Sequence, residues 1–203
     1  MVSASSEPTP YVPATVAQSV KILVVGAFGV GKTTLIGSVS EIPPLRTEEL
    51  ITEASAGVDD LSGVERKNTT TVALDFGRIT INPKLILYLF GTPGQNRFWF
   101  MWDELARGAL GAVVLADTRR LEDSFGAIDF FESRGTPFIV AVNCFDGAEI
   151  YDEDEVRQAL DIDGHVPVQL CDVRDRESSK RVLVRLLEYL MTVATAGAAA
   201  GTW

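Results

Sequence analysis

Apolar runs of strand length alternate with helical periodicity along most of the chain. The expected strands cover residues 20–26, 72–81, 85–90, 112–117, 137–143 and 166–170. Apolar residues at helical spacing predict helices near residues 31–40, 96–107, 121–134, 152–161 and 176–191. Strands that alternate with helices are typical of a parallel sheet with helices on both faces.

The second and third expected strands are separated only by Asn82, Pro83 and Lys84. So short a loop makes a hairpin, because parallel neighbours need a longer crossover. The predicted fold class is therefore α/β, with a six-stranded, mostly parallel sheet, one antiparallel edge strand and helices on both faces. The long connection over residues 41–70 is expected to hold a short helix at residues 47–54.

The two ends of the chain lack this periodicity. Residues 1–18 are rich in Ser, Thr and Pro, and residues 193–203 are mostly small. Such segments bury too little apolar surface to fold, so both are predicted to be disordered tails. The 203 residues then hold one domain over residues 19–192.

The chain is acidic, with 18 Lys and Arg against 28 Asp and Glu and a formal net charge of −10. This balance argues against binding nucleic acid or anionic lipid through a basic surface.

No apolar run approaches the roughly 20 residues of a spanning helix. The two cysteines, Cys144 and Cys171, form no spacing motif. We therefore expect a cytoplasmic protein without direct membrane insertion.

The segment from Gly26 to Thr33 matches the phosphate-binding loop G-x-x-x-x-G-K-[ST], between an expected strand and an expected helix. Its backbone N–H groups would surround the β-phosphate, and Lys32 would reach the β- and γ-oxygens as a catalytic group. The Thr33 hydroxyl would bind Mg²⁺. The phosphate-binding residues are predicted to be Gly26, Phe28, Gly29, Val30, Gly31, Lys32, Thr33 and Thr34.

The segment Gly91-Thr-Pro-Gly94-Gln95 follows the third expected strand. Taken alone it is a Gly/Pro turn. Beside a phosphate loop, however, it lies where a γ-phosphate would be sensed. The Gly94 N–H would donate to that phosphate, and Gln95 would orient the attacking water.

The segment Asn143-Cys-Phe-Asp146 closes the fifth expected strand, at the carboxyl edge where sheet ligands bind. A carboxylate at Asp146 can accept the N1–H and the 2-amino group of guanine, which adenine does not offer. The alternative is an ordinary Asn/Asp turn. The position after a parallel strand favours guanine recognition.

The order of these motifs resembles that of small Ras-like GTPases over roughly residues 19–192. More narrowly, Thr69-Thr-Thr-Val-Ala-Leu-Asp75-Phe-Gly, together with the two segments above, resembles the conservon GTPases of actinobacteria. These are relatives of the bacterial gliding-motility polarity GTPases. The resemblance implies a switch that binds GTP or GDP with Mg²⁺ and hydrolyses GTP slowly. It also implies partners of the Roadblock fold and recruitment to a membrane-associated signalling complex.

The resemblance assigns further residues. Thr71 corresponds to the switch threonine that meets Mg²⁺ and the γ-phosphate, with Thr69 and Thr70 as alternatives in the register. The last guanine loop would be formed by Cys171, Asp172 and Val173. In that loop the Asp172 N–H would face the base oxygen, although a plain loop is a second interpretation.

Several positions depart from the family pattern. Gly91 replaces the aspartate that usually holds the Mg²⁺ water shell, and Cys144 replaces the lysine that covers the guanine face. Phe28 occupies a phosphate-loop position where Ras has glycine, and the connection before Thr71 is unusually long. These departures leave metal dependence and catalytic rate open.

Two alternative functions stay open. The first is a nucleotide-loaded scaffold without turnover, favoured by Gly91 and Phe28. The second is a P-loop ATPase or small-molecule kinase, which would leave Asp146 without a role. The helix after Gln95 adds Trp99 and Phe100 outside its apolar face, either as packing residues or as a partner surface.

Overall fold

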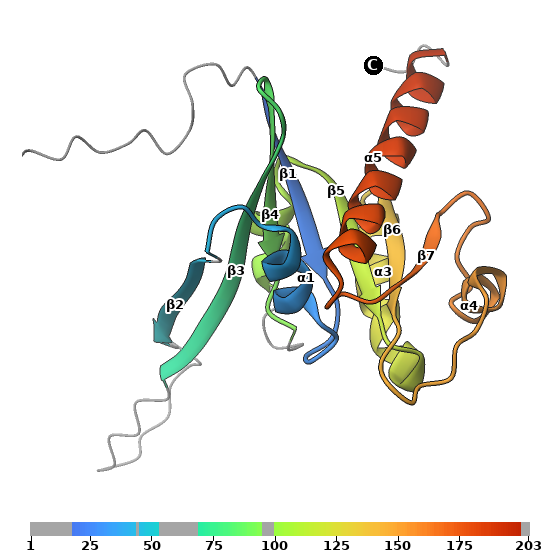
Figure 1. Cartoon of the computed structure of the whole chain (residues 1–203), viewed down its shortest axis with the longest axis horizontal. Coiled ribbons are helices and arrows are strands. Elements are labelled where there is room, and N and C mark those ends of the chain that lie inside the picture. Colours follow the sequence, from blue (N-terminus) through green and yellow to red (C-terminus); the bar gives the residue numbers. More distant parts are fainter. Residues whose placement is uncertain (1–17, 44, 53–68, 95–99, 200–203) are drawn as a thin grey trace, which may run out of the picture.

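The computed structural model describes residues 18–43, 45–52, 69–94 and 100–199. It forms one seven-stranded sheet in the order β2-β3-β4-β1-β5-β6-β7 (Figure 1). The strands are β1 (Gln18–Val25), β2 (Leu45–Thr52), β3 (Thr69–Asn82), β4 (Leu85–Gly91), β5 (Ala109–Ala116), β6 (Phe138–Asn143) and β7 (Val168–Cys171). The helices are α1 (Lys32–Val39), α2 (Phe100–Ala106), the 3₁₀ segment η2 (Thr118–Ser124), α3 (Phe125–Glu132), α4 (Glu153–Ala159) and α5 (Arg176–Ala199).

The predicted α/β fold class is confirmed, and β2 makes the sheet seven-stranded where six strands were expected. The expected strands correspond to β1 and β3 to β7, and β1, β4, β5, β6 and β7 are parallel neighbours in the sheet. The strand β3 pairs antiparallel with β4 through the predicted hairpin. The loops after β1, β4, β6 and β7 therefore leave the sheet at its carboxyl edge, where the phosphate loop and the segments that follow Gly91, Asn143 and Cys171 begin.

The helix expected over residues 47–54 is wrong for the residues described. Residues Leu45–Thr52 form β2, which pairs antiparallel with β3 from Leu45↔Phe76 to Thr52↔Thr69. The long strand β3 extends past the end of β4 and offers hydrogen-bond partners along its other edge. Pairing with that edge outweighs the helical propensity of a segment that contains Glu and Leu. The antiparallel strand β3 is consequently second from the edge.

The strand β1 explains how the sheet is held between its helices. Leu23 and Val25 point to one face and pack in the apolar cluster that contains Phe131 of α3. Ile22 and Val24 point to the other face, toward the cluster built from α1 and α5. Because both faces are covered, β1 is apolar at consecutive positions instead of alternating. This layer arrangement fixes the strand ends that carry the site.

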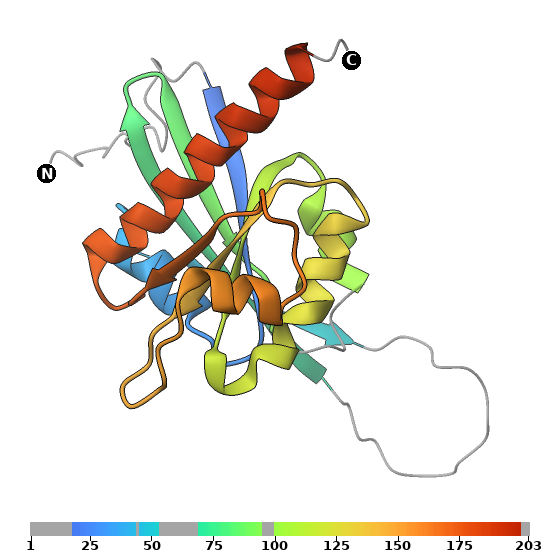
Figure 2. The ribbon, with the colours of Figure 1, turned by 90° about the vertical axis from the view of Figure 1, so that its right-hand side faces the viewer.

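The helix α5 is longer than the sequence pattern predicts. It continues through Ala199, so residues 193–199, expected to belong to a disordered tail, are helical (Figure 2). Alanine, abundant near this end, has the highest helix propensity and allows the helix to extend beyond its packed face. Among the described helices, none is long and apolar enough to cross a membrane.

Candidate functional site

The phosphate loop connects β1 to α1 and needs glycine where it turns. Gly26 has φ +139°, and a Cβ there would lie 2.4 Å from the carbonyl oxygen of Leu115. Gly31 has φ +110°, and its Cβ would lie 2.9 Å from Nδ2 of Asn143. A cavity of about 450 Å³ lies between this loop and the segment after β4. The predicted phosphate loop thus lies beside an open cavity.

Lys32 begins α1, and its side chain turns back over the loop. The residue is 8% exposed, and Nζ donates to the carbonyl oxygens of Gly26 and Ala27, both at 2.8 Å. Burial lowers the pKa of Lys32 to about 8, although the nearby Asp75 carboxylate opposes that shift. Lys32 is therefore a desolvated cation, held at present by backbone carbonyls that phosphate oxygens can replace.

The hydroxyl of Thr33, in α1, is held by a carboxylate from strand β3. Thr33 Oγ1 donates to Oδ2 of Asp75 at 2.5 Å, and Asp75 is a buried residue of β3. In the β3–β4 ladder Asp75 pairs with Gly91. The structure therefore places a carboxylate beside Thr33 although position 91 has none. Asp75 is part of the motif quoted from the sequence but was given no role there; the available signal was a carboxylate between the apolar residues Leu74 and Phe76.

The segment after β4 lies against the phosphate loop. A Cβ at Gly94 would come within 2.5 Å of Lys32 Nζ and 2.7 Å of the Phe28 nitrogen. Thr92 is 2% exposed, and its Oγ1 has no hydrogen-bond partner within the described part of the chain. Gly94 thus lies beside the phosphate loop, and donation of its N–H to a γ-phosphate stays a prediction. Gln95, Phe98 and Trp99 lie outside the described residues.

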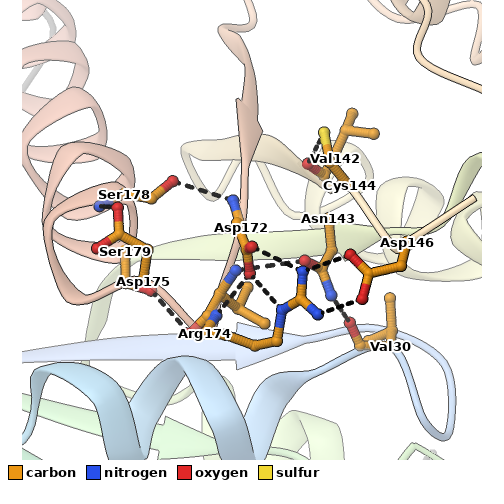
Figure 3. Close-up of polar contacts among 11 residues, drawn as sticks. Val30, Val142, Asn143, Cys144, Asp146, Asp172, Arg174, Asp175, Ser178 and Ser179 are labelled. Atoms are coloured by element: carbon orange, nitrogen blue, oxygen red, sulfur yellow. Dashed lines mark hydrogen bonds and ion pairs between the residues drawn. The ribbon is translucent and has the colours of Figure 1, made fainter. Parts of the chain in front are cut away.

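Asn143 connects the phosphate loop to the loops after β6 and β7. Its buried Nδ2 donates to the carbonyl oxygen of Val30 at 3.0 Å, and its Oδ1 accepts the Val173 N–H at 3.3 Å (Figure 3). The backbone N–H of Cys144 also donates to the Cys171 carbonyl oxygen at 2.7 Å. The structure thus brings together residues from three of the predicted segments.

Asp146 is exposed and paired, whereas a base-reading carboxylate was expected to be buried. Its side chain is 86% exposed. Arg174 Nη1 donates to Asp146 Oδ2 at 2.7 Å, and Nη2 donates to Oδ1 at 2.9 Å. The same guanidinium contacts Asp172, so it lowers the pKa of both carboxyl groups. Arg174 was also missed, because the sequence motif gave no reason to select it.

The loop after β7 differs in part from its predicted role. The Asp172 N–H, expected to face a base oxygen, donates instead to Ser178 Oγ at 3.0 Å. Ser178 lies in the first turns of α5, where a hydroxyl and free backbone groups compete for partners. Cys171 is buried, and burial raises the pKa of its thiol to about 12. That thiol therefore remains protonated and acts as a packing group.

The structure does not bring the backbone of Thr71 to the phosphate loop. Thr71 lies in β3 and pairs with Leu50 of β2, four residues before Asp75. At about 3.3 Å per residue, its backbone lies roughly 13 Å from Asp75 along the strand. Thr69 and Thr70 precede Thr71 in the same strand and lie still farther from Asp75. The switch-threonine role therefore remains a prediction for another state of this segment.

The sequence pattern of the family described as "Conserved hypothetical ATP binding protein" matches residues 24–193 of the chain. The chain belongs to this family. A relative, uncharacterized protein MJ1339 of Methanocaldococcus jannaschii, is 36% identical over 139 residues, which are 68% of this chain and 77% of that protein. The Ras-related protein RABC2a of Arabidopsis thaliana is 31% identical over 114 residues, covering 55% of this chain and 44% of its own length.

Solved structures place this family member among G domains by fold. The G domain of the T. maritima FeoB iron transporter has a TM-score of 0.60 at 20% identity, covering 85% of this chain and 99% of that domain. The FeoB G-domain of Methanococcus jannaschii has a TM-score of 0.56 at 16% identity, covering 86% and 99%. The small-GTPase-like P-loop fold predicted from the motifs is thus confirmed.

Proposed function

We propose that the chain binds GTP and GDP at the carboxyl edge of the sheet and works as a nucleotide-controlled switch. The observation that carries the proposal is the Asn143 side chain, which ties Val30 of the phosphate loop to the loops that hold Asp146 and Val173. One nucleotide can therefore place its phosphates on the first loop and its base beside Asp146. The T. maritima FeoB cytosolic domain in GDP and GMPPNP forms shares this fold over 64% of its own length, which supports a guanine nucleotide.

Mg²⁺ belongs to the proposal, and the residues present fit it. Mg²⁺ and its bound waters prefer hard oxygen groups. The site offers the Thr33 hydroxyl, the Asp75 carboxylate and the Thr92 hydroxyl, which has no hydrogen-bond partner among the described residues. Thr33 would hold the ion, with Asp75 beside it and Thr71 as the further ligand implied by the family resemblance. When bound, the ion neutralises charge on the phosphates.

Slow GTP hydrolysis is the proposed reaction. Lys32 would stabilise negative charge on the β- and γ-phosphate oxygens, and Gln95 would orient the attacking water. The Phe28 ring is 71% exposed on the phosphate loop, and the family resemblance implies that an arginine from a partner protein would have to approach beside it. The site therefore supports weak turnover by the chain alone.

An adenine nucleotide is the second candidate, because the family description names ATP. In the structure Asp146 already holds Arg174, and an adenine base would leave that pair in place.

A nucleotide-loaded scaffold without turnover remains the third possibility, as Gly91 and Phe28 suggest. Both alternatives use the same phosphate loop and differ in base choice or in phosphate release.

Partner binding is proposed from the family resemblance. Partners of the Roadblock type would bind the segment around the switch residues and recruit the otherwise cytoplasmic chain to a membrane-associated signalling complex. In α2, Trp102 is buried and packs edge-to-face on Phe130 with ring centroids 5.3 Å apart. This ring therefore belongs to the core, and a partner would have to read other residues of this segment.

The decisive experiment identifies the nucleotide that copurifies with the full chain and then measures affinities for GDP, GTP, ADP and ATP with and without Mg²⁺. The proposal expects a guanine nucleotide in the purified protein and clear preference for GDP over ADP. Equal affinity for GDP and ADP would contradict guanine recognition. Absence of phosphate release from bound GTP would favour the scaffold alternative.

A further inference from the structure

The guanidinium of Arg174 occupies the acceptor atoms that guanine recognition requires. Its two terminal nitrogens reach separate oxygens of Asp146, at 2.7 and 2.9 Å (Figure 3). A guanine base presents a similar pair of parallel donors, the N1–H and the 2-amino group. We propose that Arg174 is a gate residue, which holds Asp146 in the nucleotide-free protein and must leave it when guanine binds. This proposal rests on the proposed function.

The geometry of the pair makes the two donors mutually exclusive. A guanidinium is a planar fork that meets a carboxylate through two parallel N–H···O bonds. Both oxygens of Asp146 are engaged in this way, and guanine would need the same two oxygens for its own pair of donors. Guanine binding is therefore an exchange of one donor pair for another at Asp146.

Asp172 gives Arg174 a second place to stay. Arg174 Nε donates to Asp172 Oδ1 at 2.9 Å, and Nη2 donates to Oδ2 at 2.8 Å. The Arg174 backbone N–H also donates to Asp172 Oδ1 at 2.9 Å, and the Asp172 N–H is fixed by Ser178. When guanine takes Asp146, Arg174 remains paired with Asp172, so the exchange breaks one ion pair and keeps the other.

This arrangement predicts a modest and base-selective penalty. Asp146 and Arg174 are both exposed, with side-chain exposures of 86% and 55%, and exposed ion pairs are weak and screened by salt. Displacing Arg174 should therefore reduce guanine nucleotide affinity by only about two- to fivefold. An adenine nucleotide has no donor pair for Asp146, so its binding should not depend on Arg174.

The test compares the full-length wild type with Arg174→Ala, Arg174→Lys and the matched control Arg176→Ala. Arg176 is also exposed near the start of α5, and its guanidinium contacts the carbonyl oxygen of Ser38. Affinities for fluorescent GDP and ADP are measured by equilibrium titration over a range of KCl concentrations. Thermal unfolding of each variant checks that the fold is intact.

The gate predicts that Arg174→Ala binds GDP about two- to fivefold more tightly than the wild type. Arg174→Lys, which offers a single ammonium, should lie between them, and ADP binding should be unchanged. The difference for GDP should shrink as KCl rises, because salt weakens the pair that guanine must displace. Arg176→Ala should match the wild type throughout.

Three results would overturn the gate. These are weaker GDP binding by Arg174→Ala, unchanged GDP binding, or an equal gain for GDP and ADP, which would mean a general opening of the loop. Failure of the proposed function has a separate signature, since neither the wild type nor Arg174→Ala would then prefer GDP to ADP.

Discussion

Asp75 and Gly91 lie opposite each other in the β3–β4 ladder, and Asp75 fills the space that a side chain at position 91 would need. A Cβ at Gly91 would lie 3.0 Å from the Asp75 Cβ and 2.9 Å from Ile36 Cδ1. The carboxylate missing from β4 is thus replaced by one from β3, directed at Thr33. The proposed Mg²⁺ site is therefore expected to depend on the carboxylate of Asp75, and an added carboxylate at position 91 is not expected to improve it.

Gly91→Asp is expected to destabilise the protein without tightening Mg²⁺. The departure at Gly91 predicts that an aspartate there would tighten Mg²⁺ if the site had room, but a Cβ at this position would force Ile36 and Asp75 to shift. Overpacking a buried site costs about 1–3 kcal/mol, and two adjacent carboxylates also repel. Denaturant unfolding and GDP release against free Mg²⁺ measure the two effects. Tighter Mg²⁺ with unchanged stability would contradict this prediction.

Asp75→Asn is expected to raise the free Mg²⁺ concentration needed to retain GDP by about 10- to 100-fold. This is the usual loss of metal affinity when an outer-shell partner is removed. The amide keeps the size of the side chain but removes its charge beside Thr33. Asp129→Asn on the exposed face of α3 is the control. The measurement is the rate of GDP release as free Mg²⁺ is titrated. An Asp75→Asn curve that overlays the wild type would remove Asp75 from the metal site.

Asp146→Asn is expected to lower GTP affinity by about 10- to 100-fold, as loss of a charge-assisted hydrogen bond does. The same variant should bind xanthosine nucleotides better, because the asparagine amide can donate to the extra oxygen of xanthine. Asp154→Asn, exposed on α4, provides the control. Affinities come from competition with fluorescent GDP. If the base preference of Asp146→Asn stays that of the wild type, Asp146 does not read the base.

Nucleotide binding is expected to take up protons near pH 8. Burial lowers the pKa of Lys32 from 10.5 to about 8 in the nucleotide-free protein, so about half of the molecules carry an uncharged lysine at pH 8. Bound phosphates favour the ammonium and raise that pKa. GDP affinity should therefore be flat below pH 8 and fall above it. Calorimetry in buffers of different ionisation enthalpy should show uptake of about half a proton at pH 8; no uptake would contradict the assignment.

Phosphate release from GTP is expected to be slow, at about 10⁻⁴–10⁻³ per second without a partner. Gln95→Ala should lower this rate further, because the water loses the side chain that orients it. Adding a Roadblock-type partner tests whether phosphate release is accelerated. Arg66→Ala tests whether an arginine from the long connection over residues 41–70 contributes to the rate. Fast unassisted turnover, or an unchanged rate in Gln95→Ala, would argue against this mechanism.

The parallel core of the sheet was predictable because its strands are apolar at consecutive positions and end in recognisable turns. The strand β2 was not, since Leu45–Thr52 contains adjacent glutamates and no clear alternation. Its conformation depends on β3, which supplies the backbone partners along its whole length. Local propensity cannot report a partner that comes from elsewhere in the chain.

The residues of the candidate site also fall into two groups, those that a local motif predicts and those that depend on contacts between distant elements. The phosphate loop and the position of Asn143 follow from motifs whose spacing is fixed by one strand and one turn. Asp75 and Arg174 act across elements, one through the β3–β4 register and the other across the loops after β6 and β7. Such contacts depend on which strands are neighbours, and a single sequence does not contain that information.

The hydrogen bonds of Asn143 also bear on how a nucleotide would assemble its own binding site. Because one amide joins Val30 to Val173, ordering the phosphate loop also orders the loop beside the base. A nucleoside and a pyrophosphate bound separately would each have to meet that ordering cost, whereas an intact nucleotide meets it once. We therefore expect the two halves of GDP to behave as a chelating pair, with the second half binding at high effective concentration once the first is seated.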